Sequence, residues 1–235
     1  MDEAGFIDEA ERALKLDKAG LIGGCLRLPV VVDADQLRRE VEALSDEAWA
    51  TTGGRTGVHS AAAALFLRGH APAAGRQPIQ DLPVLDDLPY CRTLITEVIG
   101  APPLRCLLAR LPGGGRIAAH TDRGPYFAGT IRVHFPVITH PEVWMLCDGL
   151  VYAMATGEAW ALNNSASHGV WNADPARPRT HLICDFKSAP GLLDLLVSGE
   201  RGLGRRSDAV VREIGVREVG VREVSVHEPG KPDGL

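Results

Sequence analysis

Short runs of β-type residues, separated by Gly, Pro and Asp, follow one another through the second half of the chain. They span residues 104–111, 116–122, 129–137, 142–147, 150–155, 158–162, 168–172 and 179–186. The gaps between them are too short for crossover helices, so neighbouring strands should pair antiparallel. About eight such strands fit a jelly roll, also called a double-stranded β-helix. We therefore expect a mainly β protein with flanking helices, whose barrel core spans residues 104–187.

The region before the barrel, residues 1–103, has a helical pattern instead. Apolar residues recur at helical spacing near residues 6–18, and again over 33–48 behind a potential aspartate cap. A third helix should begin near Pro89, because proline suits a first helical turn. Residues 69–88 are rich in Gly, Pro and Asp and predict a long loop. We expect this region to support the barrel and to contribute to the side that binds substrate.

Two further segments follow the barrel. Residues 188–210 contain a cluster of leucines that predicts a short closing helix. Residues 211–235 repeat a pentad that begins Val211-Arg-Glu-Ile-Gly. A period of five matches neither a helix nor a strand, so no continuous apolar face is expected. We predict a mobile extension or an edge strand that is dispensable for folding and catalysis, with a partner-binding tail as the alternative.

Composition narrows the classes of function. The formal net charge is −5 and no basic stripe is present, which argues against a nucleic-acid partner. No apolar stretch is long enough to span a membrane, and the first residues lack a secretory signal pattern, so a cytoplasmic location is expected. The five cysteines are scattered without a CxxC pair and indicate buried thiols rather than disulfides or a zinc site. The oligomeric state stays open.

A potential metal site is the most informative motif. His120 and Asp122 are separated by one residue, so both side chains can project from the same face of a strand. His168 lies 48 residues further on, on another predicted strand. Two histidines and one carboxylate can occupy one face of an octahedral Fe(II) and leave positions open for a co-substrate and oxygen. For the His-x-Asp pair alone, a loop pair with an unrelated core histidine would be the simpler interpretation, but the strand context favours a metal centre.

Arginines downstream of the motif suggest an anionic ligand. Arg179 begins an alternating strand, and a guanidinium inside a barrel requires a carboxylate partner that this strand does not provide. Arg177 is the rival for the same role. The alternation of residues 131–137 puts Arg132 and His134 together on one face, which would be either a cavity lining or a solvated surface.

Several motifs occur in the order found in a known family. They are Leu111-Pro112-Gly113, His120-Thr-Asp122, Arg132-Val-His134-Phe-Pro136, Gly157-Glu158-Ala-Trp160, His168-Gly-Val170-Trp-Asn172 and Arg179-Thr-His181-Leu-Ile-Cys-Asp185. This stretch resembles the aspartyl/asparaginyl β-hydroxylase-like family, which includes bacterial proline hydroxylases among the Fe(II)/2-oxoglutarate-dependent dioxygenases.

The resemblance implies a jelly-roll hydroxylase that uses Fe(II), 2-oxoglutarate and O2. It implies that 2-oxoglutarate chelates the iron while Arg179, helped by Arg132 and His134, holds its far carboxylate. No catalytic residue is expected beyond the metal centre. The gap between His168 and Arg179 is about one residue longer than is usual in the family, which leaves the choice between Arg177 and Arg179 open.

The resemblance also implies an amino acid substrate, free or within a peptide, hydroxylated on an unactivated side-chain carbon. Arg116 and Arg123 flank the His-x-Asp strand, and we expect one of them to bind a substrate carboxylate, with Trp171 nearby. Other candidates for the substrate side are Trp49, His59, Arg68 and Tyr126. The alternative function is that of a cupin-like protein that holds a metal and binds a small molecule without turnover. Such a protein would not need Arg179.

Overall fold

The computed structural model describes residues 16–50, 62–71 and 77–215. Most of the helix expected near residues 6–18 lies outside these ranges, as do His59 and the pentads after Gly215. None of the helices within the described ranges is long and apolar enough to cross a lipid bilayer.

Helices and strands alternate up to residue 98, and strands predominate between residues 103 and 187. The N-terminal elements are α2 (Lys18–Leu21), β1 (Cys25–Leu28), α3 (Ala34–Glu42), α4 (Asp46–Ala50), β2 (Ala63–Arg68), the 3-10 helix η1 (Pro83–Asp87), α5 (Pro89–Thr93) and the π-helix η2 (Leu94–Val98). The barrel strands and the short helix among them are β3 (Pro103–Leu111), β4 (Arg116–His120), α6 (Pro125–Gly129), β5 (Thr130–Ile138), β6 (Val143–Cys147), β7 (Leu150–Tyr152), β8 (Ala159–Leu162), β9 (His168–Asn172) and β10 (Arg179–Lys187). Two helices follow, α7 (Pro190–Ser198) and α8 (Asp208–Gly215).

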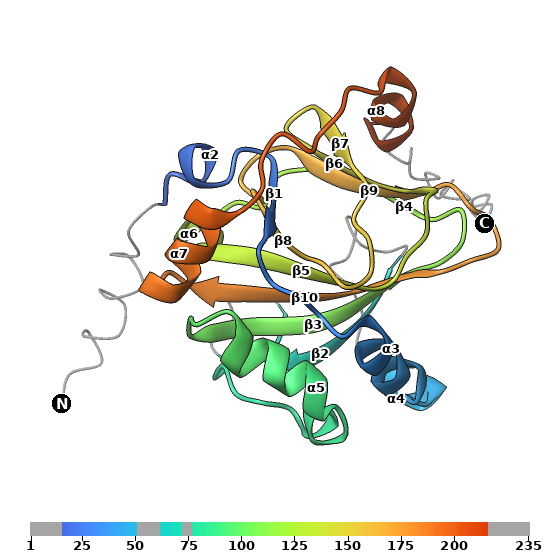
Figure 1. Cartoon of the computed structure of the whole chain (residues 1–235). Helices are drawn as coiled ribbons and strands as arrows, with labels where there is room; N and C mark the ends of the chain where they lie inside the picture. Colours follow the sequence, from blue (N-terminus) through green and yellow to red (C-terminus); the bar gives the residue numbers. More distant parts are fainter. Residues whose placement is uncertain (1–15, 51–61, 72–76, 216–235) are drawn as a thin grey trace, which may run out of the picture.

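Two antiparallel sheets face each other and confirm the predicted jelly roll (Figure 1). The larger sheet has the strand order β1-β8-β5-β10-β3-β2, and the smaller has the order β4-β9-β6-β7. An apolar cluster fills part of the space between them, with Ile117, Met145 and Val170 from the smaller sheet packed against Leu111 and Trp160 from the larger. The remaining space between the sheets contains the polar residues described below.

The larger sheet extends beyond the predicted barrel. Strand β1 pairs with β8 and strand β2 pairs with β3, so the N-terminal region supplies both edge strands as well as helices. The expected boundary near residue 103 therefore does not separate a helical unit from a β unit. Both strands were missed because their sequences, Cys-Leu-Arg-Leu and Ala-Ala-Leu-Phe-Leu-Arg, are short, lie among segments with a helical pattern, and pair only with distant segments.

Helices cover the outer face of the larger sheet. The Asp33 side chain accepts a hydrogen bond from the Gln36 N–H, as the sequence predicts, and Leu37 and Val41 of α3 are buried. The helix ends at Glu42 instead of continuing to residue 48. Helices α3 and α5 and the closing helix α7 lie along this sheet, and their apolar residues form one core with the outward residues of β5, including Phe135.

Helix α8 corrects the prediction for the start of the tail. It contains the first pentad, residues 211–215, and covers the outer face of the smaller sheet (Figure 1). Val210 and Ile214 are buried there against Leu146 of β6 and Val151 of β7. Gly169 of β9 allows this close approach, because a Cβ atom at that position would lie 2.5 Å from the Ile214 Cγ2.

A chain that ends after Ser207 is therefore expected to be less stable. Burial of each apolar side chain contributes about 1.5–3 kcal/mol, so loss of Val210 and Ile214 should lower the free energy of unfolding by about 3 kcal/mol. The melting temperature should fall by about 6–12 °C, which calorimetry can measure. The control ends after Gly215 and keeps α8. Equal melting temperatures for the two truncated chains would show that the helix contributes nothing to stability.

Candidate metal centre

Three side chains meet between the sheets at one end of strands β4 and β9. One ligand atom from each of His120, Asp122 and His168 lies within 4.8 Å of the other two. His120 and His168 are direct partners in the β4–β9 pair, with ring centroids 4.3 Å apart. The sequence thus identified residues that the fold brings together.

Asp122 reaches the site differently from the way the strand pattern predicts. Strand β4 ends at His120, and the segment after it turns so that the Asp122 N–H donates to the Asn164 carbonyl over 3.0 Å. The alternation of side chains along a strand therefore does not place this carboxylate. Its position depends instead on the loop that precedes His168.

Backbone carbonyls fix the orientation of both imidazole rings. His120 Nδ1 lies 2.9 Å from the Ala118 oxygen, and His168 Nδ1 lies 3.0 Å from the Ala166 oxygen. Because a carbonyl can only accept, each Nδ1 carries a proton, which leaves Nε2 as the atom that can bind a metal. Burial and the neighbouring His120 lower the pKa of His168 to about 4, so this ring is neutral at pH 7 and its Nε2 keeps a lone pair. A neutral imidazole nitrogen is what a divalent metal requires.

Asp122 is held as a carboxylate. Burial alone would raise its pKa, but the Arg132 guanidinium, His168 and Asn164 hold the pKa at about 2. Arg132 Nη1 donates to Oδ2 over 2.7 Å, and the Asn164 amide donates to the same oxygen over 3.1 Å. The other oxygen, Oδ1, lies 3.9 Å from His120 Nε2. Two imidazole nitrogens and one carboxylate oxygen therefore converge, and this donor set fits Fe(II).

Arg132 donates hydrogen bonds to two carboxylates, those of Asp185 and Asp122. Its Nε and Nη2 donate to the two oxygens of Asp185 over 2.8 and 3.1 Å, while Nη1 binds Asp122. Although burial opposes the charge, the two carboxylates raise the pKa of Arg132 above its usual value. This arginine orients Asp122, a potential metal ligand, and its expected contact with 2-oxoglutarate stays a prediction.

Arg179 lies on the inner face of β10 and is almost completely buried, with 2% of its surface exposed. Its Nε and Nη2 have no hydrogen-bond partner among the described residues. Burial lowers the pKa of Arg179 to about 9, so the guanidinium is still charged at pH 7. A buried, unpaired cation is costly, and a ligand carboxylate would relieve that cost.

Two further histidines accompany Arg179. His134 of β5 and His181 of β10 face each other with their Nδ1 atoms 3.3 Å apart, and neither Nε2 has a partner in the described part of the chain. Burial, with Arg179 nearby, lowers the pKa of both rings well below the usual value, so both are neutral. The cluster thus offers an anion, such as the carboxylate of 2-oxoglutarate, the Arg179 guanidinium and one imidazole N–H, since the Nδ1–Nδ1 hydrogen bond leaves an Nε2 proton on only one of the two rings.

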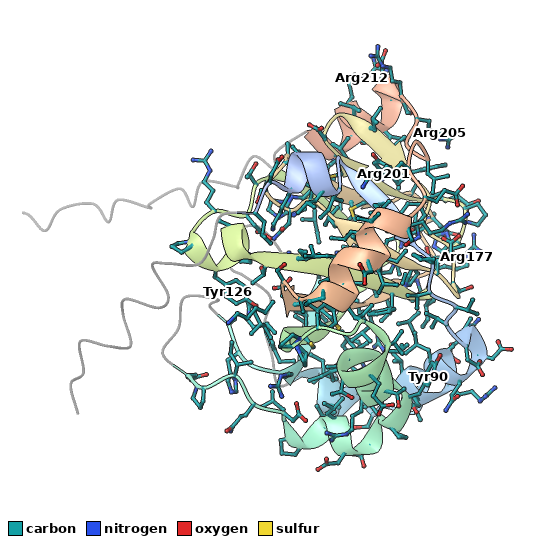
Figure 2. The ribbon with its side chains drawn as sticks, turned by 60° about the vertical axis from the view of Figure 1, so that its left-hand side comes forward. Tyr90, Tyr126, Arg177, Arg201, Arg205 and Arg212 are labelled. Atoms are coloured by element: carbon teal, nitrogen blue, oxygen red, sulfur yellow. The ribbon has the colours of Figure 1, made fainter. Side chains whose placement is uncertain are left out.

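Arg177 occupies a different environment. It is exposed and forms ion pairs with Asp174 and, over 3.0 Å, with Glu142. In Figure 2 it lies on the opposite side of the ribbon from Tyr126, which contacts Asp185 near the metal centre. Of the two rivals that the sequence leaves open, only Arg179 points between the sheets.

The residues predicted for substrate binding are dispersed. Arg116 and Trp171 are register partners whose side chains lie toward α8, on the face of the smaller sheet opposite to the metal site, and Arg116 is within 3.5 Å of Glu213. Arg123 is exposed directly after Asp122. Trp49 stacks against Arg110 on the outer face of the larger sheet, with the guanidinium carbon 3.8 Å from the ring centroid. The substrate roles of these residues stay predictions, and the structure does not bring Arg116 or Trp171 to the metal site.

Lys18 and Asn164 are residues of the site that sequence reasoning missed. The Lys18 ammonium is buried and donates to Asn164 Oδ1 and to the Phe127 carbonyl, each over 2.6 Å. A protonated lysine cannot accept a hydrogen bond, so the amide oxygen of Asn164 must face Lys18 and its NH2 must face Asp122. Burial and Arg132 lower the pKa of Lys18 to about 8, which leaves it mostly protonated at pH 7.

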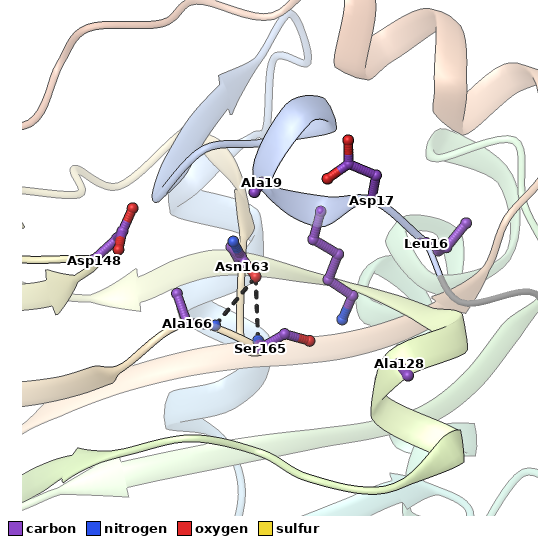
Figure 3. Close-up of a pocket in the computed structure, with 9 residues that line it drawn as sticks. Leu16, Asp17, Ala19, Ala128, Asp148, Asn163, Ser165 and Ala166 are labelled. Carbon is purple, nitrogen blue, oxygen red and sulfur yellow. Dashed lines mark hydrogen bonds between the residues drawn. The ribbon is translucent and has the colours of Figure 1, made fainter.

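A pocket of about 440 Å³ adjoins Lys18 on the surface (Figure 3). It is lined by residues of α2 and by the loop that carries Asn163, whose side-chain oxygen accepts from the Ser165 and Ala166 N–H groups. The loop before His168 is thus fixed both by its own turn and by the N-terminal segment. No sequence motif predicts the hydrogen bond between Lys18 and Asn164, because the two residues are 146 positions apart.

We expect Lys18→Met to weaken metal binding. The variant keeps the length of the side chain but frees the Asn164 amide to rotate, so Asp122 loses a donor. Loss of such an indirect contact typically costs about 10–100-fold in metal affinity, and we expect a value of about 10-fold. Anaerobic titration with Fe(II) would measure it, with Lys187→Met, at an exposed lysine, as the control. Equal affinities for wild type and Lys18→Met would exclude this role.

Comparisons with known proteins place these observations in context. The sequence matches the Aspartyl/Asparaginyl beta-hydroxylase family over residues 33–189. No curated protein matches the chain. A structure of a prolyl hydroxylase from Trichoplax adhaerens, in complex with a hypoxia inducible factor oxygen degradation domain peptide fragment, is 9% identical and covers 85% of this chain and 98% of that chain, with a TM-score of 0.51.

Two further solved structures are similar over most of the chain. A 2OG-Fe(II) oxygenase family oxidoreductase from Burkholderia pseudomallei is 20% identical, with 79% of this chain and 91% of that chain covered and a TM-score of 0.49. A prolyl-4-hydroxylase from Pseudomonas putida is 17% identical, with 75% and 98% covered and a TM-score of 0.40. At these identities the Trichoplax structure supports the fold alone. The family match covers most of the barrel and includes all three potential metal ligands, and it shows that the chain belongs to the Aspartyl/Asparaginyl beta-hydroxylase family, a family of 2OG-Fe(II) oxygenases.

Proposed function

We propose that this protein is an Fe(II)/2-oxoglutarate-dependent dioxygenase that hydroxylates an unactivated side-chain carbon of an amino acid, free or within a peptide. One observation carries the proposal. The potential metal ligands and the buried Arg179, which has no ion-pair partner among the residues that the structure describes, lie in the same interior between the two sheets. A protein that only held a metal would have no use for a buried cation without a partner.

One set of residues would hold the metal, and another would bind the co-substrate. His120, Asp122 and His168 would hold Fe(II), and Arg132 and Asn164 orient the carboxylate ligand. Arg179 would bind the far carboxylate of 2-oxoglutarate. One of the two neutral rings, His134 or His181, would donate to it from Nε2, because the Nδ1–Nδ1 hydrogen bond leaves an Nε2 proton on only one of them. When bound, the iron supplies the redox chemistry that activates O2 at the expense of 2-oxoglutarate.

The barrel contributes a dry interior. His134, His168, Arg179 and His181 are all at least 95% buried, so water has little access to the cluster. Exclusion of water strengthens the electrostatic contacts in the site and protects a reactive centre from side reactions. The substrate must therefore approach from the side of the metal that faces away from Arg179, since the co-substrate would fill the space between them.

Anaerobic addition of Fe(II) and then 2-oxoglutarate tests the proposal. We expect a weak visible charge-transfer band that requires both additions and is lost in His168→Ala. Succinate release should then require a substrate and O2. Iron binding without this band would indicate instead a cupin-like protein that binds metal but does not use 2-oxoglutarate.

A further inference from the structure

A second arginine without an anionic partner lies between the sheets. Arg105 is on β3, and its side chain shares the inner face of the larger sheet with Phe66 of the neighbouring strand β2. Its guanidinium carbon lies 5.3 Å from the Phe66 ring centroid and 5.6 Å from that of Tyr126. Its Nε is buried without a hydrogen-bond partner, and no carboxylate in the described ranges forms an ion pair with it.

Arg105 is connected to the metal centre through a short series of contacts. Its backbone N–H donates to the Tyr126 oxygen over 3.3 Å, and the Tyr126 O–H donates to Asp185 over 3.2 Å. Asp185 binds Arg132, which in turn binds the metal ligand Asp122. Tyr126, Asp185 and Arg132 thus connect Arg105 with the proposed metal ligand Asp122.

Arg105 and Arg179 lie toward opposite ends of the same strand pair. Arg179 is the register partner of Leu111 at one end of β3, whereas Cys184 pairs with Cys106, next to Arg105, near the other. The metal ligand Asp122 is bound to Arg132, whose register partner on β10 is Asp185, on the Arg105 side of the pair. A co-substrate that reaches from the metal to Arg179 would leave the Arg105 side free for a second ligand.

The surroundings of Arg105 favour a carboxylate as that ligand. Two aromatic rings lie over the guanidinium, so cation–π contacts stabilise the charge while its N–H groups stay available at the edge of the plane. Gly69 makes room for the side chain, since a Cβ atom there would lie 3.1 Å from the Arg105 Cγ. A planar fork of this kind binds carboxylates in a bidentate manner.

We propose that Arg105, held between Phe66 and Tyr126, binds a carboxylate of the substrate and so sets which carbon faces the metal. The proposal rests on the proposed function, and it replaces Arg116 and Arg123 as the first candidate for this role. Fixing one end of a small substrate restricts which C–H bonds can approach the metal, which is how position selects one carbon among similar ones. The substrate class is thus a molecule with a free carboxylate, as in an amino acid or at a peptide C-terminus.

Binding without turnover tests this assignment. Protein loaded with Ni(II) and 2-oxoglutarate would be titrated calorimetrically with the twenty proteinogenic amino acids, with Gly-X dipeptides, and with the C-terminal amide of each. We expect at least one acid to bind the wild type about 30-fold or more tightly than its amide, because the amide lacks the charge. Arg105→Met should remove this difference by weakening the acid alone, and Arg105→Lys should retain part of it. Comparison of the free amino acids with the dipeptides shows whether the carboxylate comes from a free amino acid or from a peptide C-terminus.

Arg110→Met is the matched control, since Arg110 is on the same strand but stacks on Trp49 at the outer face. Its preference for the acid should equal that of the wild type. The assignment would be overturned if no acid binds, if acid and amide bind the wild type equally, or if Arg105→Met keeps the preference. Each variant is first shown to form the Fe(II)–2-oxoglutarate band, so a failure of this assignment is separate from a failure of the oxygenase proposal.

Discussion

His168→Ala is expected to abolish both iron retention and turnover. The substitution removes one of three protein ligands, and the remaining His120 and Asp122 cannot hold a divalent ion in the same geometry. His168 is 5% exposed and its Nδ1 contacts the Ala166 carbonyl, so the wild-type ring is held in a fixed orientation toward the other two residues. Iron content after anaerobic reconstitution and desalting should fall from about one equivalent to background, and succinate formation should fall with it.

His140→Ala provides a control for this measurement. His140, Glu142 and Asp174 form a second group whose potential ligand atoms lie close together, but both carboxylates already pair with Arg177. Removal of His140 should therefore leave the iron content at one equivalent. Retention of iron and activity in His168→Ala would contradict the assigned centre, and loss of iron in His140→Ala would move it to the second group.

Arg179→Met is expected to raise the 2-oxoglutarate requirement strongly while leaving iron in place. Loss of one partner of a buried charge pair costs about 2–5 kcal/mol, which corresponds to a dissociation constant at least about 30-fold higher. The substitution should not destabilise the free protein, because the wild-type guanidinium is buried without a partner in the described part of the chain and methionine removes that cost. Titration of the charge-transfer band with 2-oxoglutarate would give the constant, and the melting temperature of the variant should equal or exceed that of the wild type.

Arg177→Met should behave like the wild type in the same titration. This arginine is exposed and paired with surface carboxylates, and such pairs contribute little. If Arg177→Met raised the constant and Arg179→Met did not, the role of the buried arginine would be structural.

The strand pattern predicted the barrel well because its signals are local. Turn residues bound each run between 104 and 186, and every predicted strand is present with ends that differ by a few residues. Strands β1 and β2 are short and isolated in the N-terminal region, and their pairing depends on contacts with segments far along the chain. Helix α8 was missed because the pentad conceals a helical signal that begins one residue earlier, where Val210 and Ile214 are four residues apart and bury together.

The site likewise contains residues that the sequence could predict and contacts that it could not. His120 and His168 could be predicted as ligands because both are histidines on strands that the sequence indicates. Arg179 could be predicted because the alternation of its strand places it on one face. The contacts that orient them were not predictable, since Lys18 and Asn164 are distant in the chain and Asp122 leaves the strand that was expected to carry it. Arg105 gives no sequence signal, because its environment is formed by Phe66 and Tyr126, which lie on other elements.

The pairing of His120 with His168 bears on the order of assembly. The two ligands are brought together by antiparallel strands joined through the long segment that contains β5 to β8, so the loop-closure entropy of that segment must be overcome before both can bind one ion. The unfolded chain accordingly offers iron only the local His120–Asp122 pair, and the complete set of three ligands forms only with the barrel. Iron should enter a preformed barrel and slow its unfolding, without changing the rate at which the barrel forms. Refolding rates measured with and without Fe(II) should therefore coincide, and faster refolding with the metal would show an earlier site.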